Sequence, residues 1–139
     1  MPRLLFVLCS FFLGPSLVRA QEGLSLDPAV HYVVTGGHWS SEGADGQYRV
    51  IVRSGGFDHI VSDLYIQWIQ DPRGKDDSAR VRVTVKVDSL SGIWALDQPK
   101  LVCTPSCRLE VSGTDTHAMT KGRWVLTLGA PGRVTVRKA

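Results

Sequence analysis

The sequence predicts an all-β protein, an antiparallel β-sandwich of about seven to nine short strands, Ig-like or jelly-roll-like, with a small β-barrel as the alternative. Several segments alternate apolar and polar residues, which is the pattern of a strand with one face on a core. Glycine and proline separate these segments at short intervals, as turns do. No segment has the period of about 3.6 residues that marks an amphipathic helix.

The first half of the chain carries four expected strands. Ala29–Val34 is short and rich in β-branched residues. Gln47–Arg53 and Ala79–Val87 place mainly β-branched or aromatic residues on one face and mainly polar residues on the other. Phe57–Gln70 is apolar on both faces, which is typical of a strand in the middle of a fold. A helix over residues 60–69 is the alternative for that segment.

The second half carries five expected strands: Gly92–Leu96, Lys100–Cys103, Cys107–Val111, Arg123–Leu128 and Arg133–Arg137. The last two flank a turn of glycine, alanine and proline at residues 129–132, and this pattern predicts a hairpin. Three polar or glycine-rich segments are expected to be loops: Thr35–Gly46, Asp71–Ser78 and Ser112–Gly122. Because loops on a rigid sandwich most often carry function, we expect binding residues there.

The N-terminal segment, residues 1–20, is typical of a cleavable secretory signal. Arg3 gives a basic start, Leu4–Leu13 is apolar, and Val18-Arg19-Ala20 forms a cleavage site before Gln21. The apolar run is shorter than the roughly 20 residues that span a bilayer. We therefore expect one β domain over residues 21–139, periplasmic or secreted, with no transmembrane segment in the mature chain.

Cys103 and Cys107 are predicted to form a disulfide across a tight turn. Removal of the signal takes away Cys9, so the exported chain keeps one pair, and such a pair in an oxidising compartment is by default a disulfide. Between them Pro105 fixes one backbone dihedral angle. We expect the turn to be a small, fixed projection that a partner binds.

The same two cysteines allow a metal site as the alternative. Thiolate, imidazole and thioether groups suit Cu(I), and Cys103, Cys107, His117 and Met119 supply all three. A periplasmic copper carrier using these four residues is therefore the alternative function. The first interpretation needs no metal and no other cofactor.

The glycine-rich segment Thr35–Gly46 holds further candidate binding residues, His38, Trp39 and Glu42, which join Pro105 in the candidate set. Trp39 combines a large apolar face with one hydrogen-bond donor, which suits stacking on a sugar ring or anchoring a partner protein. A carbohydrate-binding module using Trp39 is thus a second alternative. The interpretation without a binding role is that Trp39 folds back over the open end of the sandwich, since large aromatic side chains are mostly buried.

The net charge and the absence of catalytic motifs argue against nucleic-acid binding and against catalysis. The formal net charge is +3, and two of the basic residues, Arg3 and Arg19, belong to the signal, so no basic cluster for nucleic acid is expected. Asp58 and His59 would point to opposite faces of a strand, and no catalytic serine or zinc motif occurs. Scarce lysine and absent asparagine favour a GC-rich bacterial genome. We expect a non-catalytic interaction protein, an envelope accessory subunit or inhibitor-like module, whose partner is another envelope or extracellular protein.

Overall fold

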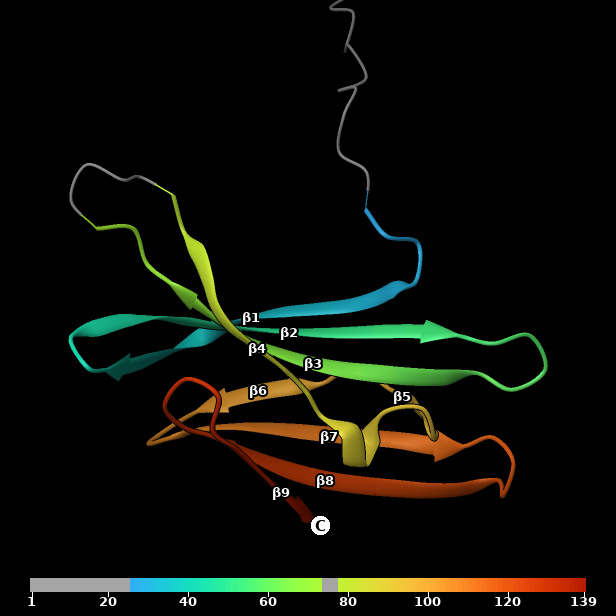
Figure 1. Ribbon diagram of the computed structural model, residues 1–139. Helices are drawn as coiled ribbons and strands as arrows, with labels where there is room; N and C mark the ends of the chain where they lie inside the picture. The colour runs from blue at the N-terminus through green and yellow to red at the C-terminus, as the bar shows by residue number, and fades with distance from the viewer. Residues whose placement is uncertain (1–25, 74–77) are drawn as a thin grey trace, which may run out of the picture.

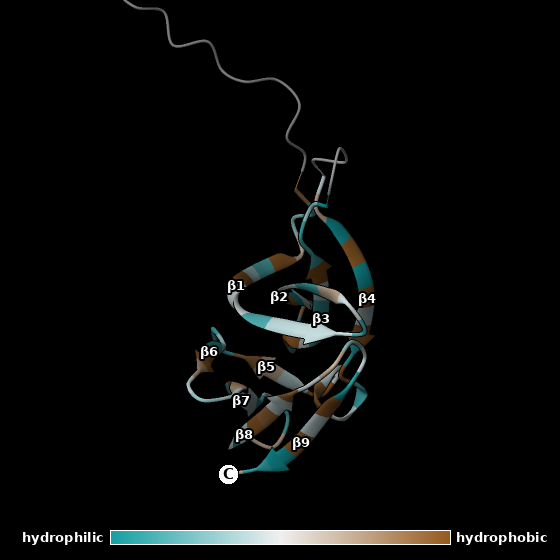
Figure 2. Cartoon of the chain, turned by 90° about the vertical axis from the view of Figure 1, so that its left-hand side faces the viewer, coloured by the Kyte–Doolittle hydropathy of each residue, from teal (hydrophilic) through white to brown (hydrophobic). Residues whose placement is uncertain are grey.

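The computed structural model describes residues 26–73 and 78–139 (Figure 1). The expected signal segment, with Cys9 and the cleavage site before Gln21, lies outside the described residues. Within them the chain folds into two antiparallel sheets of four and five strands. This arrangement confirms the predicted all-β sandwich class, and Figure 2 shows the two layers from one end.

The first sheet takes its strands in chain order: β1 (Val30–Ser41), β2 (Ala44–Gly55), β3 (Val61–Gln70) and β4 (Arg80–Lys86). The register sets Val50 opposite Ile66 and Val52 opposite Leu64, so these four side chains share the inner face. All four are fully buried. The segment for which a helix was the alternative is therefore a strand, as its β-branched residues indicate.

A 3-10 turn, η1 (Asp88–Leu90), leads to the second sheet, which contains β5 (Trp94–Leu96), β6 (Lys100–Cys103), β7 (Cys107–Asp115), β8 (Thr120–Leu128) and β9 (Val134–Lys138). β5 and β6 pair with successive parts of β7, and β8 and β9 follow in order. The predicted C-terminal hairpin is the β8–β9 pair. Each sheet uses consecutive strands, so the chain passes between the sheets once, whereas Ig-like and jelly-roll sandwiches exchange strands between them. The strand order thus departs from both expected arrangements.

Two of the expected loops are largely strand, so those predictions were wrong. Thr35–Gly46 continues β1 to Ser41 and resumes as β2 at Ala44, which leaves only a two-residue turn. The glycines that suggested a loop instead allow a register shift within β1. Likewise most of Ser112–Gly122 belongs to β7 and β8. In the third expected loop, the described residues 71–73 and 78 belong to none of the nine strands, and residues 74–77 lie outside the described part.

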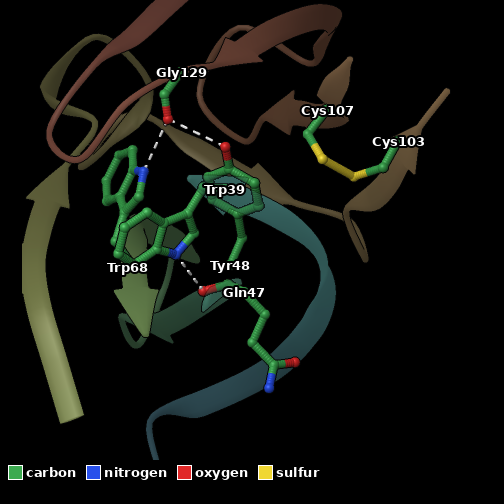
Figure 3. Close-up of a disulfide and its surroundings, with 7 residues drawn as sticks. All are labelled: Trp39, Gln47, Tyr48, Trp68, Cys103, Cys107 and Gly129. Carbon is green, nitrogen blue, oxygen red and sulfur yellow. Dashed lines mark hydrogen bonds between the residues drawn. A yellow bond between two sulfur atoms is a disulfide. The ribbon is translucent and has the colours of Figure 1, made fainter. Parts of the chain in front are cut away.

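A carbonyl of the β8–β9 turn ties the two sheets together. Trp68 donates its indole N–H to the carbonyl oxygen of Gly129 at 3.0 Å, and the Tyr48 hydroxyl donates to the same oxygen at 3.1 Å (Figure 3). Both donors come from the first sheet, and the acceptor comes from the second. Because a carbonyl oxygen has two lone pairs, it accepts both bonds without competition.

Candidate functional site

Cys103 and Cys107 form the predicted disulfide. They lie directly opposite each other at the ends of β6 and β7, with Thr104, Pro105 and Ser106 exposed in the turn between them (Figure 3). The backbone of Gly37 in β1 runs so close that an added Cβ would lie 2.5 Å from the Cys103 sulfur. The disulfide therefore holds the turn in one shape and also contacts the edge of the other sheet.

Trp39 is buried, so it lacks the exposed indole face that the carbohydrate-binding alternative requires. Its residue is 3% exposed, it lies in β1 rather than in a loop, and its indole N–H donates to the carbonyl oxygen of Gln47 at 3.1 Å. The guanidinium carbon of Arg82 lies 5.9 Å from the centre of the indole ring. A side chain covered in this way presents no free face to a sugar. Trp39 instead packs in the core, as the alternative interpretation of a buried tryptophan predicts.

The other candidate binding residues are exposed. His38 follows Gly37 in β1, Glu42 lies in the β1–β2 turn, and Pro105 lies in the disulfide turn. Both turns are at the left in Figure 1. Gly37, next to His38 in β1, contacts the disulfide, so His38 lies at the same end, which we call the disulfide end. A carboxylate oxygen of Glu42 is 3.6 Å from the Arg82 guanidinium. The structure thus brings three of the four candidates to one end and covers the fourth.

The four residues of the copper alternative do not converge. Cys107 begins β7, with Cys103 opposite it at the end of β6, whereas His117 and Met119 lie in the turn that follows the end of β7. The nine-residue strand spans about 26 Å at about 3.3 Å per residue, far beyond the reach of one ion. The two sulfurs are also bonded to each other and are not thiolates. Among residues 26–73 and 78–139, no group of three or more histidine, cysteine, aspartate or glutamate side chains is placed to hold a metal ion.

The opposite end of the sandwich exposes large apolar side chains. Phe57 is 101% exposed and Ile60 49% in the β2–β3 turn, Met119 is 76% exposed in the β7–β8 turn, and Ile93 is 48% exposed just before β5. Trp94, which follows Ile93, pairs with Asp115 at the end of β7. All three turns therefore lie at the right in Figure 1, and we call this end of the sandwich, with its four exposed apolar residues, the apolar end.

Two contacts join the turns of the apolar end. The hydroxyl of Thr116 donates to the carbonyl oxygen of Ile60 at 3.3 Å. The imidazole rings of His59 and His117 lie against each other, with their centres 3.8 Å apart and their planes inclined by 30°. Thus the β2–β3 turn of the first sheet and the β7–β8 turn of the second form one surface.

Asp115 shapes the second of these turns. Its Oδ1 accepts the backbone N–H groups of Ala118 at 3.0 Å and of His117 at 2.9 Å. These two bonds, and then the nearby His117 and His59 rings, hold the pKa of the Asp115 carboxyl below its usual value. The carboxylate is therefore negatively charged at neutral pH, next to two imidazoles.

Sequence reasoning missed the apolar end. It placed Phe57 and His59 inside a strand, but β3 begins only at Val61. Gly55 and Gly56 precede Phe57, and this pair was the available signal for a turn that extends past Phe57. Because Asp58 and His59 lie in the turn, the strand argument that separated them no longer applies.

The part of the chain that the structure describes contains no helix long and apolar enough to cross a bilayer. No family model, no curated protein and no solved structure matches this chain.

Proposed function

We propose that this chain is an exported, non-catalytic binding protein that docks another envelope or extracellular protein, as an accessory subunit or an inhibitor-like module. The observation that carries the proposal is the apolar end. Large apolar side chains that gather on turns at one end of a rigid sandwich mark interaction sites more often than scattered surface residues do. The disulfide is compatible with an extracellular or periplasmic location, since such bonds persist in oxidising compartments.

Phe57 is the expected anchor of the docking surface. It is fully exposed, so its burial by a partner removes the whole ring from water, and aromatic anchors of this kind carry much of the binding energy of an interface. The hydrogen bond from Thr116 to Ile60 and the contact of His59 with His117 fix the turns before a partner arrives. A surface already fixed loses less entropy on binding.

Site-specific photo-crosslinking in the exporting cell tests the proposal. The benzophenone analogue of phenylalanine is placed at position 57 and, in a matched control, at position 33. Val33 is also apolar and 53% exposed, but it lies on β1, on the outer face of the first sheet. We expect one discrete adduct with an envelope protein from position 57 and none from position 33.

The effect of single substitutions gives the second readout. Phe57→Ser is expected to abolish the adduct formed by a probe at position 119, whereas Val33→Ser leaves it unchanged. Equal adducts from positions 57 and 33, or none from position 57, would contradict the proposal.

A further inference from the structure

Two histidines at the apolar end form a second group of chemically reactive side chains, apart from the disulfide. The chain has four histidines; His31 and His38 lie on β1, while His59 and His117 come from turns of different sheets and meet. Both His59 and His117 are exposed. Among the residues that the structure describes, no hydrogen bond or ion pair engages either of their rings. The ring nitrogens are therefore available to a ligand.

The backbone beneath the pair is fixed. Asp115 accepts two backbone N–H groups and so sets the turn that carries His117. The hydroxyl of Thr116 donates to Ile60, the residue after His59. These hydrogen bonds hold the two turns that carry His59 and His117 next to each other. A ligand that needs both imidazoles finds them already placed, which reduces the entropy lost on binding.

We propose that His59 and His117 together chelate a divalent transition-metal ion of the Cu(II), Ni(II) and Zn(II) group. Imidazole nitrogen suits these ions, and two nitrogens bound at about 2.0–2.1 Å to one ion lie roughly 3 to 3.5 Å apart. Ring centres 3.8 Å apart, with planes inclined by 30°, place both imidazoles within reach of one ion, and rotation of the side chains brings one nitrogen of each ring to it. We expect water to fill the remaining positions, because residues 26–73 and 78–139 place no third histidine, cysteine, aspartate or glutamate side chain there.

The surroundings favour a cation. The Asp115 carboxylate lies at the start of the turn that carries His117, where it accepts the backbone N–H groups of His117 and Ala118. A carboxylate near the two rings attracts a cation through its charge. It supports the ion electrostatically without contacting it. This site shares only His117 with the copper carrier expected from the sequence, and it does not depend on the proposed partner protein.

Metal titration of the exported chain tests the site. The protein is purified without a polyhistidine tag, stripped of metal, and titrated with Cu(II), Ni(II), Zn(II) and, as a control, Mg(II). We expect one Ni(II) or Zn(II) ion per chain, tightest binding for Cu(II), and none for Mg(II), which prefers oxygen ligands. Because the ion joins the two sheets, Zn(II) in large excess is expected to raise Tm by about 5 °C or more.

Histidine variants decide where the ion binds. His59→Ala and His117→Ala are each expected to weaken Zn(II) binding by roughly tenfold or more and to remove the Tm shift. The matched controls, His31→Ala and His38→Ala, are expected to bind as the unchanged chain does. Metal-free Tm values near that of the unchanged chain show that the exposed substitutions leave the fold intact. The proposal is wrong if no transition metal raises Tm, if a control variant weakens binding equally, or if His59→Ala/His117→Ala still binds.

Discussion

Gly37→Ala tests the contact between β1 and the disulfide. Gly37 has a φ of 66°, and a Cβ there would lie 2.5 Å from the Cys103 sulfur, 2.7 Å from the Cys107 sulfur and 3.1 Å from a ring carbon of Tyr48. Gly43 is the matched control. Its φ is 71°, but an added Cβ meets nothing within 4 Å.

The two substitutions separate backbone strain from steric conflict. A left-handed backbone costs a residue with a Cβ roughly 1–2 kcal/mol, so Gly37→Ala and Gly43→Ala both incur that cost. The conflict with the sulfurs occurs only at Gly37, and overpacking of this kind costs about 1–3 kcal/mol more. We therefore expect Gly37→Ala to lower the free energy of unfolding by about 2–5 kcal/mol, and Gly43→Ala by about 1–2 kcal/mol.

Urea unfolding followed by tryptophan fluorescence measures the difference. The same pair of substitutions is then made in a chain carrying Cys103→Ala and Cys107→Ala, in which the sulfurs are absent. There the cost of Gly37→Ala should fall towards that of Gly43→Ala. The reasoning is refuted if the two substitutions differ by less than about 0.5 kcal/mol in the oxidised chain, or if removal of the sulfurs leaves their difference unchanged.

Three further outcomes are expected. Tyr48→Phe should cost about 0.5–1.5 kcal/mol in urea unfolding, because Gly129 keeps its bond from Trp68 and is not left unsatisfied; a loss above about 3 kcal/mol would contradict this. Phe57→Ser should change Tm by less than about 2 °C, since the ring is fully exposed, and a large drop would show that it packs. The pKa of Asp115 is lower in the folded chain than its unfolded value of about 3.9, so the carboxylate stabilises the fold above that pH, and this contribution is lost as pH falls through the folded pKa. Asp115→Asn should therefore weaken the pH dependence of the urea midpoint below about pH 4. An unchanged pH dependence would refute the assignment.

The strands with clear alternation were predictable from sequence. Val50 and Val52 are fully buried, as the pattern of Gln47–Arg53 predicts, and the C-terminal hairpin forms across the expected turn. A side chain that alternates with polar neighbours has only one face available for the core, so the local pattern determines its direction. The rule holds only in part for Ala79–Val87, most of which is β4: Val87 is buried and Val83 and Val85 pack against the core, but Val81 is exposed because the register with β3 shifts beside it.

Composition misled the prediction at Thr35–Gly46. Glycine, serine and histidine suggest a loop when they are read locally, but β1 is an edge strand whose outer residues face water and tolerate polar side chains. Its pairing with β2 is long-range information that the segment itself does not carry. For the same reason the burial of Trp39 was open to two interpretations.

The candidate sites were only partly predictable. The disulfide followed from two cysteines and a short spacer, because the chain itself brings them together. His117 and Met119 are close to the cysteines in sequence, yet a straight strand carries them to the other end of the sheet. The meeting of His59 with His117 depends on how two sheets stack, and their separation of 58 positions in the printed sequence gives no local pattern.

The single passage between the sheets has a consequence for how the protein folds. Hairpins of neighbouring strands close short loops, which cost little entropy and form quickly, so each half of the chain is able to assemble its own sheet early. The first sheet, however, then presents Val50, Leu64 and Ile66 to water until the second half arrives. A chain released after β4 would hold complete strand pairing but a bare apolar face, and such a fragment is prone to aggregate. The last strands to emerge therefore act as the cover that keeps the earlier ones in solution.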